Sequence, residues 1–254
     1  MKLIDNHCHL DFPQYDEDRE EVMEECKEKL ELVVNSGSSP ENNKTTLELS
    51  REHQGFVYPT MGMHPVKIDG MDEGDIEEIV NSIKQHEDEI VAVGEIGMDF
   101  HHESSKEGRK KQERIFRRLL KLAEELKMPV VVHSRDAEKQ VLDILDEYDL
   151  ESVILHCFNG NTDLAEKAVE RNYFISITTQ VLYSSRVQEL VKSTPLENII
   201  LETDAPYLYP GDSRNFPYKV YESLEKISDI LGKEKEELAD IFNRNTRDAY
   251  LQAF

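Results

Sequence analysis

The stretch Leu3-Ile4-Asp5-Asn6-His7-Cys8-His9 opens the sequence with an apolar run that leads directly into a His-x-His pair. In an extended strand, successive side chains point to opposite faces. His7 and His9 are therefore expected to point the same way, with Cys8 on the other face. Two imidazoles on one face at the end of a strand supply half of a metal site. A lone His-x-His can equally be two ordinary surface histidines, so the rest of the chain decides its meaning.

The remainder of the sequence alternates short apolar runs with charged, amphipathic segments. Eight runs are expected to be strands, at residues 3–7, 30–35, 56–61, 90–95, 129–133, 153–157, 174–178 and 198–204. Helical patterns cover residues 19–30, 41–53, 73–86, 107–126, 136–148, 163–171, 184–192, 217–231 and 234–251.

Eight strand–helix units in a chain of 254 residues predict an α/β fold, a TIM-type (β/α)8 barrel that forms a single domain over residues 1–254. The main alternative is a doubly wound open sheet. That fold would place a glycine-rich fingerprint after its first strand, where this chain has His-Cys-His.

The net charge and the length of the apolar runs limit the classes of function that this protein can have. The formal net charge of −23 argues against loose, charge-driven binding to nucleic acid or to anionic membranes. It leaves room for a phosphate ester held through divalent cations, which dominate the local field where they bind. No run approaches the ~20 apolar residues of a membrane span, and the N-terminus lacks a signal pattern. A soluble, cytoplasmic protein without membrane attachment is expected.

The cysteines are too few to build a disulfide framework. Cys8, Cys26 and Cys157 are an odd number, and no pairing pattern is implied. Cys8 and Cys157 each neighbour a histidine at a strand end, and strand alternation predicts that both thiols face away from it.

Imidazoles and carboxylates recur where the predicted strands end. In a (β/α)8 barrel, catalytic groups lie at the C-terminal ends of the strands, whatever their distance in sequence. The side chains expected there are His7, His9, His64, Glu95, His133, His156 and Asp204. This nitrogen and oxygen donor set suits zinc, manganese or a similar divalent ion.

The number of donors predicts two metal ions. A single tetrahedral zinc with an open position uses three protein ligands. Six candidates are present, namely His7, His9, Glu95, His133, His156 and Asp204. Glu95 is the expected bridge, because it lies on the fourth strand, between the two histidine groups. Two metals about 3.5–4 Å apart can hold both the attacking and the leaving oxygen of a phosphoryl displacement.

Six motifs together resemble the TatD family of metal-dependent deoxyribonucleases, within the amidohydrolase superfamily. They are Asp-Asn-His-Cys-His at 5–9, Gly-Met-His-Pro at 62–65, Gly-Glu-Ile-Gly-Met-Asp at 94–99, Val-His-Ser-Arg at 132–135, Leu-His-Cys-Phe at 155–158 and Glu-Thr-Asp-Ala-Pro at 202–206. Each motif is weak alone, but the combination is specific and covers essentially the whole chain. Met98 departs from the expected Leu, a volume-conserving exchange.

The resemblance implies a barrel with two divalent ions (Mg²⁺, Mn²⁺ or Zn²⁺) that hydrolyses DNA, as a 3′-to-5′ exonuclease acting on single strands or 3′ ends. It implies that His7 and His9 hold one metal with Glu95 and Asp204, and that His133 and His156 hold the other with Glu95. Asp204 would orient a metal-activated water and take its proton. His64 is assigned to the scissile phosphate or to proton delivery, with loop capping as the alternative.

Basic and polar residues near the predicted mouth are candidates for substrate binding. Arg135 and Arg214 can each grip a phosphate through two hydrogen bonds, and Asn215 can hydrogen-bond the substrate. Arg135 can equally pair with Asp136 or with a helix carboxylate.

Other residues near the strand ends carry open alternatives. Tyr207 or Tyr209 can stack on a base or pack beneath the loop. Asp99 can hold a ligand histidine or cap its loop, and the pair His101-His102 is expected on the loop surface.

Two other functions compete with the nuclease. The first is a small-molecule amidohydrolase that cleaves an amide, lactone or phosphoester on the same barrel, since one fold hosts several chemistries. In many such enzymes a modified lysine bridges the metals, so Glu95 on the fourth strand favours the nuclease. The second is a non-catalytic binding module that keeps a metal site. Six candidate metal ligands are more than a structural metal ion needs, which disfavours it. A monomer is expected.

Overall fold

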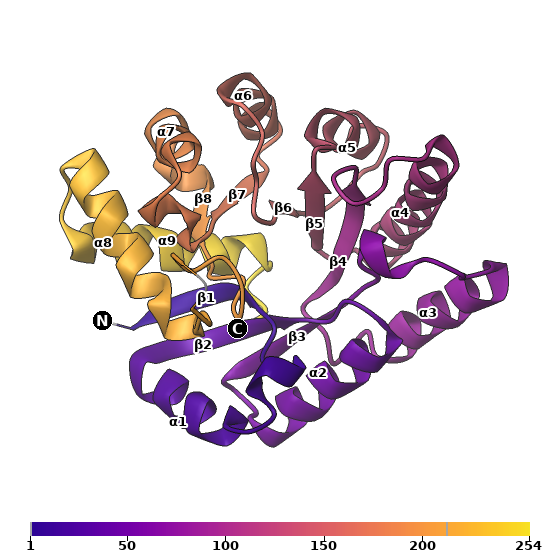
Figure 1. Ribbon diagram of the computed structural model, residues 1–254, viewed down its shortest axis with the longest axis horizontal. Coiled ribbons are helices and arrows are strands. Elements are labelled where there is room, and N and C mark those ends of the chain that lie inside the picture. Colours follow the sequence, from indigo (N-terminus) through magenta and orange to yellow (C-terminus); the bar gives the residue numbers. More distant parts are fainter. Residues whose placement is uncertain (1, 212) are drawn as a thin grey trace.

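Residues 2–211 and 213–254 are described by the structure, a computed structural model. Eight parallel strands form one sheet in which consecutive strands are neighbours, and the helices stand outside them (Figure 1). This confirms the (β/α)8 barrel. The strands are β1 (Leu3–Cys8), β2 (Leu30–Ser36), β3 (Val57–Met61), β4 (Ala92–Asp99), β5 (Val130–Arg135), β6 (Val153–Leu155), β7 (Phe174–Ile177) and β8 (Ile199–Leu201).

The helices follow the strands as the amphipathic pattern predicts. They are α1 (Arg19–Lys29), α2 (Pro40–Glu52), α3 (Glu73–Gln85), α4 (Lys106–Leu126), α5 (Glu138–Leu145), α6 (Thr162–Glu170), α7 (Ser185–Ser193), α8 (Val220–Leu231) and α9 (Lys235–Ala249). No helix among the described residues combines the length and the apolar character needed to cross a bilayer.

Strand ends differ from the prediction where the chain turns into the mouth. β4 continues past Glu95 to Asp99, whereas β6 stops at Leu155 and β8 at Leu201. Beyond β6 and β8 the backbone enters the left-handed region, at Cys157 (φ 46°) and Asp204 (φ 56°). The predicted strands therefore extend two residues too far after β6 and three residues too far after β8.

Two apolar layers hold the barrel together. Alternate residues of the strands, such as Ile4, Val34 and Val131, fill the interior, where Tyr250 joins them from the end of α9. The other strand residues pack outward against the helices, for example against the buried Leu119 of α4. Burial of both strand faces explains why the strands are continuous apolar runs in the sequence.

The seam between β8 and β1 closes through the loop that carries Asp204. The Asp204 N–H donates to the His7 carbonyl (3.0 Å), and the His9 N–H donates to the Ala205 carbonyl (2.8 Å). The buried Asp5 carboxylate accepts from the Thr203 N–H (2.9 Å) and hydroxyl (2.6 Å). These hydrogen bonds hold the loop that carries Asp204 against β1, the strand that carries His7.

Candidate metal centre

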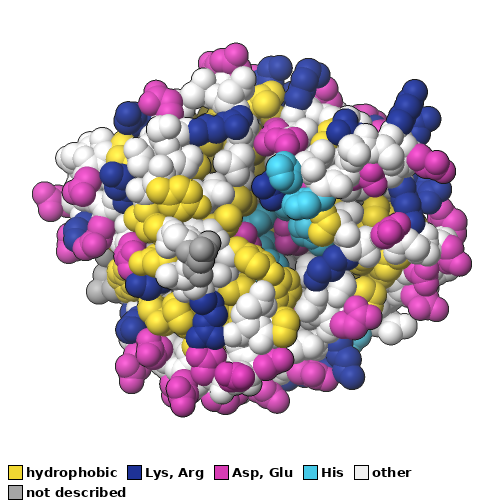
Figure 2. All heavy atoms as spheres, viewed as in Figure 1, with side chains coloured by type: hydrophobic (Ala, Val, Ile, Leu, Met, Phe, Trp, Pro, Cys, Tyr) yellow, Lys and Arg dark blue, Asp and Glu magenta, His cyan; other side chains and the backbone are white. Residues whose placement is uncertain are grey.

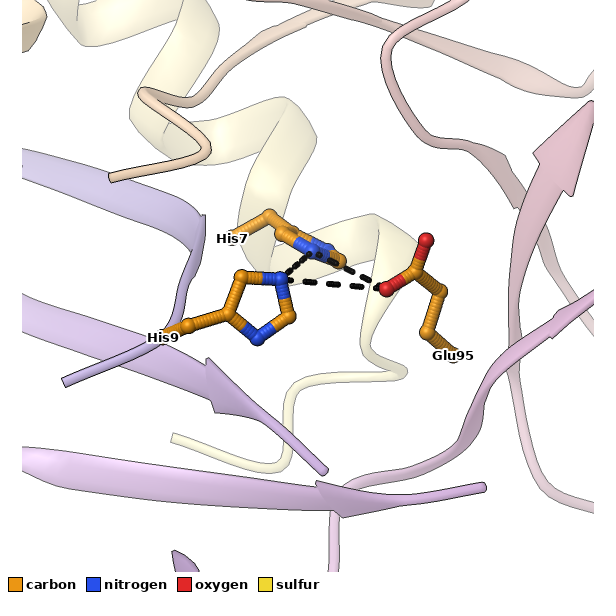
Figure 3. Close-up of side chains that lie close together, drawn as sticks. All are labelled: His7, His9 and Glu95. Carbon is orange, nitrogen blue, oxygen red and sulfur yellow. Dashed lines mark hydrogen bonds and ion pairs between the residues drawn. The ribbon is translucent and has the colours of Figure 1, made fainter. Parts of the chain in front are cut away.

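A first group of donors lies at the end of β1. The Nε2 atoms of His7 and His9 are 3.2 Å apart, and they lie 3.7 and 3.8 Å from Glu95 Oε2, so that the three side chains point toward one another (Figure 3). Asp204 Oδ1 is 3.4 Å from His9 Nε2 and 3.8 Å from His7 Nε2. Ligands about 2.0–2.2 Å from a tetrahedral ion are themselves separated by about 3.3–3.6 Å. The first group therefore has the spacing of a metal site.

A second group surrounds the other oxygen of Glu95. His133 Nδ1 is 2.9 Å and His64 Nε2 is 3.3 Å from Glu95 Oε1, and the two nitrogens are 3.3 Å apart. His156 Nε2 lies between the groups, 3.7 Å from Glu95 Oε1 and 3.8 Å from Asp204 Oδ1. Each carboxylate oxygen of Glu95 thus faces its own set of nitrogens, which is the arrangement of a bridging ligand.

Outer contacts decide which histidine nitrogen is free to bind a cation. Three rings have an acceptor atom within 3.0 Å on the side away from the centre, which favours the proton on that side. His9 Nδ1 is hydrogen-bonded to the Ser36 carbonyl (2.9 Å) and His133 Nε2 to Asp99 Oδ2 (3.0 Å). His156 Nδ1 lies 2.9 Å from Glu202 Oε1, an ion-pair contact without hydrogen-bond geometry. The nitrogens that face Glu95 are left with a lone pair, as metal ligation requires. Asp99 is therefore a partner of His133, one of its two predicted roles.

In His64 the proton is on the other side of the ring, the side that faces the centre. The backbone N–H of Val66 donates to His64 Nδ1 (3.2 Å), which must therefore carry a lone pair. In the neutral ring the proton then lies on Nε2, the atom that faces Glu95 and His133. His64 is thus arranged as a hydrogen-bond donor at the centre, whereas His9, His133 and His156 are arranged as ligands.

The charge of the site favours a bound cation. Glu95 is only 2 % exposed, and burying an unpaired carboxylate is costly. Burial alone would lower the pKa of His156, but the Glu202, Glu95 and Asp204 carboxylates raise it to about 10. Bound divalent cations would neutralise the same three carboxylates that raise the pKa of His156. The donors present fit such ions, and no thiolate is required.

Two glycines let the backbone close around Glu95. Gly97 has φ 148°, and a Cβ on it would lie 2.0 Å from the His133 carbonyl oxygen. A Cβ on Gly62 would lie 2.5 Å from the Glu95 carbonyl oxygen. Side chains at these positions would push β3 and β5 away from β4, and the two donor groups would separate.

Cys8 and Cys157 differ, although alternation predicts that both face away. Cys8 is buried, with its Sγ 3.6 Å from the Val34 carbonyl, as expected. Cys157 is partly exposed and lines a cavity with His156 and Asp204, so that prediction is wrong. Alternation holds only within a strand, and β6 ends at Leu155, two residues before this left-handed position.

Two hollows adjoin the donor groups. One, of about 190 Å³, is lined by Phe12, Val66, Lys67 and Tyr207 together with donor residues. The other, of about 330 Å³, is lined by Arg135, Arg186 and Gln180 among others, and it also reaches donor residues. Histidine side chains gather at a hollow in the centre of this face, with apolar and basic side chains beside it (Figure 2).

The predicted substrate residues are in different environments. Arg135 lines the larger hollow and does not pair with Asp136, whose carboxylate instead contacts His101 (3.2 Å). Arg214 pairs with Asp18 and lies over the rings of Tyr15 and Phe216, outside the linings of both hollows.

Asn215 lies beneath the loop that follows β8. Its side chain is fully buried, and its amide donates to Thr179 Oγ1 (3.0 Å) and to the carbonyls of Thr203 (3.0 Å) and Tyr207 (2.7 Å). A fully buried amide has no exposed atom to offer a substrate. Asn215 shapes the loop from below, so the direct contact predicted for it is not retained.

Tyr207 and Tyr209 lie in different environments, and so do His101 and His102. Tyr207 is 46 % exposed at the smaller hollow, whereas the Tyr209 hydroxyl donates to Glu222 (2.7 Å) and packs away from it. His102 Nδ1 lies 3.0 Å from Asp99 Oδ2, and His101 borders the larger hollow. The pair is at the surface as predicted, and His101 also edges the mouth.

Three side chains at the centre escaped the sequence interpretation. Lys67 Nζ donates to Ser38 Oγ (2.8 Å) at the smaller hollow, and Glu202 holds His156. Glu202 is the first residue of the Glu-Thr-Asp-Ala-Pro motif and Lys67 lies two residues after Gly-Met-His-Pro, so position in or near a motif was a usable signal. Arg186 of α7 belongs to no motif, and only its place in the fold brings it to the larger hollow.

A (β/α)8 barrel with buried histidine and carboxylate donors at the C-terminal mouth defines a metal-dependent hydrolase. Comparison with known proteins agrees with this class. The family model described as TatD related DNase matches residues 4–251. The chain therefore belongs to the TatD family.

Individual relatives cover nearly the whole chain. An uncharacterized metal-dependent hydrolase of Methanocaldococcus jannaschii is 38 % identical over 97 % of this chain and 96 % of its own length. Deoxyribonuclease TATDN3 of Homo sapiens is 35 % identical (96 % and 92 %), and the 3′-5′ ssDNA/RNA exonuclease TatD of Salmonella typhimurium is 30 % identical (99 % and 100 %). The crystal structure of a TatD homologue from Escherichia coli K12 superposes with a TM-score of 0.88 at 26 % identity, over 97 % of each chain.

Proposed function

We propose that this protein is a metal-dependent deoxyribonuclease that removes nucleotides from the 3′ end of DNA. One observation carries the proposal: the two oxygens of the buried Glu95 face two separate sets of histidine nitrogens. Such a bridge supports two ions rather than one, and a two-ion centre suits the displacement of one oxygen by another at phosphorus. The names of the human and Salmonella relatives are in keeping with it.

The proposed ligands are those predicted. His7, His9 and Asp204 would hold one ion and His133 and His156 the other, with Glu95 shared; Mg²⁺, Mn²⁺ and Zn²⁺ are the candidate ions. When bound, the ions would make water a nucleophile at neutral pH and offset the charge of the phosphate. Asp204, whose side chain is 14 % exposed, is placed to accept the proton of the attacking water.

His64 has the complementary task. Its Nε2–H points into the centre because Val66 holds Nδ1 as an acceptor. We assign it to donate a hydrogen bond to the scissile phosphate or a proton to the leaving 3′-oxygen. Arg135, at the rim of the larger hollow, is retained as a phosphate ligand.

The alternative is a small-molecule amidohydrolase. A narrow, closed pocket without Arg135 and Arg214 at its mouth would favour it. Here Arg135 borders the larger hollow together with Arg186, whereas Arg214 lines neither hollow. The two functions are separated by assaying the pure protein, with each metal added, on single-stranded DNA and on a panel of amides, lactones and phosphate esters. We expect DNA to be cleaved and the amides and lactones to be left intact. The opposite result would replace the nuclease with the amidohydrolase.

The finer features of the proposal are a preference for single strands or free 3′ ends, a monomeric state and a cytoplasmic location. A barrel that is complete in one chain supports the monomer, which sedimentation analysis would check.

A further inference from the structure

The larger hollow is continuous with the metal centre. It lies at the mouth ends of β5, β6 and β8, and His133, His156 and Asp204 belong both to its wall and to the donor groups. Arg135 at the end of β5 and Arg186 in the first turn of α7 form another part of the same wall. A group bound there would lie directly beside the reacting atoms.

Both guanidinium groups in this wall lack an acidic partner. Within the described part of the chain, neither Arg135 nor Arg186 has a carboxylate within ion-pair distance. That is unexpected in a chain with 53 acidic and 30 basic residues. Most arginines elsewhere in the described residues are paired, as in Arg51–Glu89 (2.7 Å), Arg114–Glu73 (3.0 Å) and Arg117–Glu147 (2.8 Å), whereas Arg109 and Arg244 have no such ion pair.

The acidic residues of the same wall leave the two arginines available. Asp136 is engaged by His101 at 3.2 Å. Glu138 also lines this wall and attracts Arg186 electrostatically, but the two do not form an ion pair. The wall therefore offers an anion two guanidinium groups, each able to donate two parallel hydrogen bonds.

We propose that Arg186, together with Arg135, binds a second phosphate of the substrate strand, next to the phosphate held at the metal centre. This inference rests on the proposed nuclease function. A single strand would then cross the mouth with a phosphate in the larger hollow and with bases toward Phe12 and Tyr207 on the other side, where aromatic rings can stack on them. The site would bind a strand of at least two phosphates better than a single nucleotide.

Substitution of Arg186 tests the site kinetically. We expect Arg186→Ala to raise KM for single-stranded dT12 by about 10-fold or more, with kcat within about twofold, because the contact is made equally in the ground and transition states. Arg186→Lys should recover only part of the loss. The control is Arg244→Ala on α9, beside Asn243, whose side chain accepts from the Ile4 N–H at the far end of β1 (3.1 Å). Equal KM for the Arg186→Ala and Arg244→Ala variants would overturn the inference.

Uncharged backbone linkages in the DNA strand can identify which phosphate Arg186 binds. A set of dT12 strands, each with one uncharged methylphosphonate away from the scissile bond, should include one position that raises KM for the wild type and has no further effect on Arg186→Ala. If the rise in KM caused by the methylphosphonate and the rise caused by Arg186→Ala multiply at every position, Arg186 binds no phosphate.

Binding of the same strands by fluorescence anisotropy separates this inference from the proposed function. Cleavage without any dependence on Arg186 would refute the phosphate site alone. Binding through Arg186 without cleavage would refute the nuclease and support the site. A protein that neither binds nor cleaves the strands would refute both.

Discussion

The histidines of the centre are distinguished by one hydrogen bond each. His133 donates outward to Asp99, whereas His64 accepts from the Val66 N–H. The two rings are T-shaped neighbours with centroids 4.4 Å apart, yet these outer contacts give them opposite roles. The sequence places both residues at strand ends, but it does not contain the tautomers, because those depend on which group the fold places behind each ring.

This difference predicts different defects for the two residues. His64→Gln should retain its metal and lose about 10²–10⁴-fold in kcat, since only proton donation is removed. His133→Gln should lose metal as well as activity. Metal content by plasma mass spectrometry beside kcat separates the two, and loss of metal from His64→Gln would make His64 a ligand.

Asn215 is predicted to serve stability rather than binding. Removing three buried hydrogen bonds by Asn215→Ala should lower the free energy of unfolding by about 2–3 kcal/mol, with KM for DNA nearly unchanged. Asn81→Ala, at an exposed position of α3, is the control and should stay within about 0.5 kcal/mol of wild type. Urea unfolding measures both. A large rise in KM with full stability would restore the substrate contact.

At the scale of the elements, the strands were predictable and their mouth ends were not. Apolar runs located all eight strands because both faces of a barrel strand are buried. Alternation correctly paired His7 with His9, which lie within β1 and just past its end. It failed at Cys157, because a left-handed residue beyond β6 resets the direction of the side chains. The larger hollow was likewise hidden, since Arg135 and Arg186 come from β5 and α7 and meet only in the folded barrel.

The extension of β4 to Asp99 has a functional consequence. Asp99 is 1 % exposed and holds the outer nitrogen of His133 on the neighbouring strand. Asp99→Asn should lower metal affinity about 10- to 100-fold while the fold persists, as outer-shell changes usually do. Metal titration monitored by calorimetry measures this. Unchanged affinity would reduce Asp99 to a cap for the His102 loop.

For the whole molecule, the acidic charge and the metal centre act together. The net charge of −23 opposes contact with DNA, so affinity must come from local cations at one mouth. Length, periodicity and strand-end residues were sufficient to predict the barrel and its family. The charge distribution around the mouth was not predictable, because it depends on which acids and bases the fold pairs with one another.

Metal removal should therefore destabilise the entire barrel. Glu95 on β4 and Asp204 after β8 both lie close to the histidines of β1, so bound cations would link distant strands. Cations that bind only to the folded state would stabilise that state. With metal at about 100 times its Kd, we expect Tm to rise by about 5–10 °C over the chelated protein. Glu95→Gln should abolish most of that rise, and an equal rise in the variant would place the ions elsewhere.

The most direct test of the nuclease is digestion of a single-stranded DNA oligomer labelled at its 5′ end, with Mg²⁺, Mn²⁺ or Zn²⁺ added in turn. Wild-type protein should produce a metal-dependent ladder that shortens from the 3′ end. Glu95→Gln and Asp204→Asn should produce none, whereas Glu225→Gln and Asp229→Asn on the exposed face of α8 should match wild type. An intact oligomer in the presence of metal-loaded wild-type protein would contradict the account.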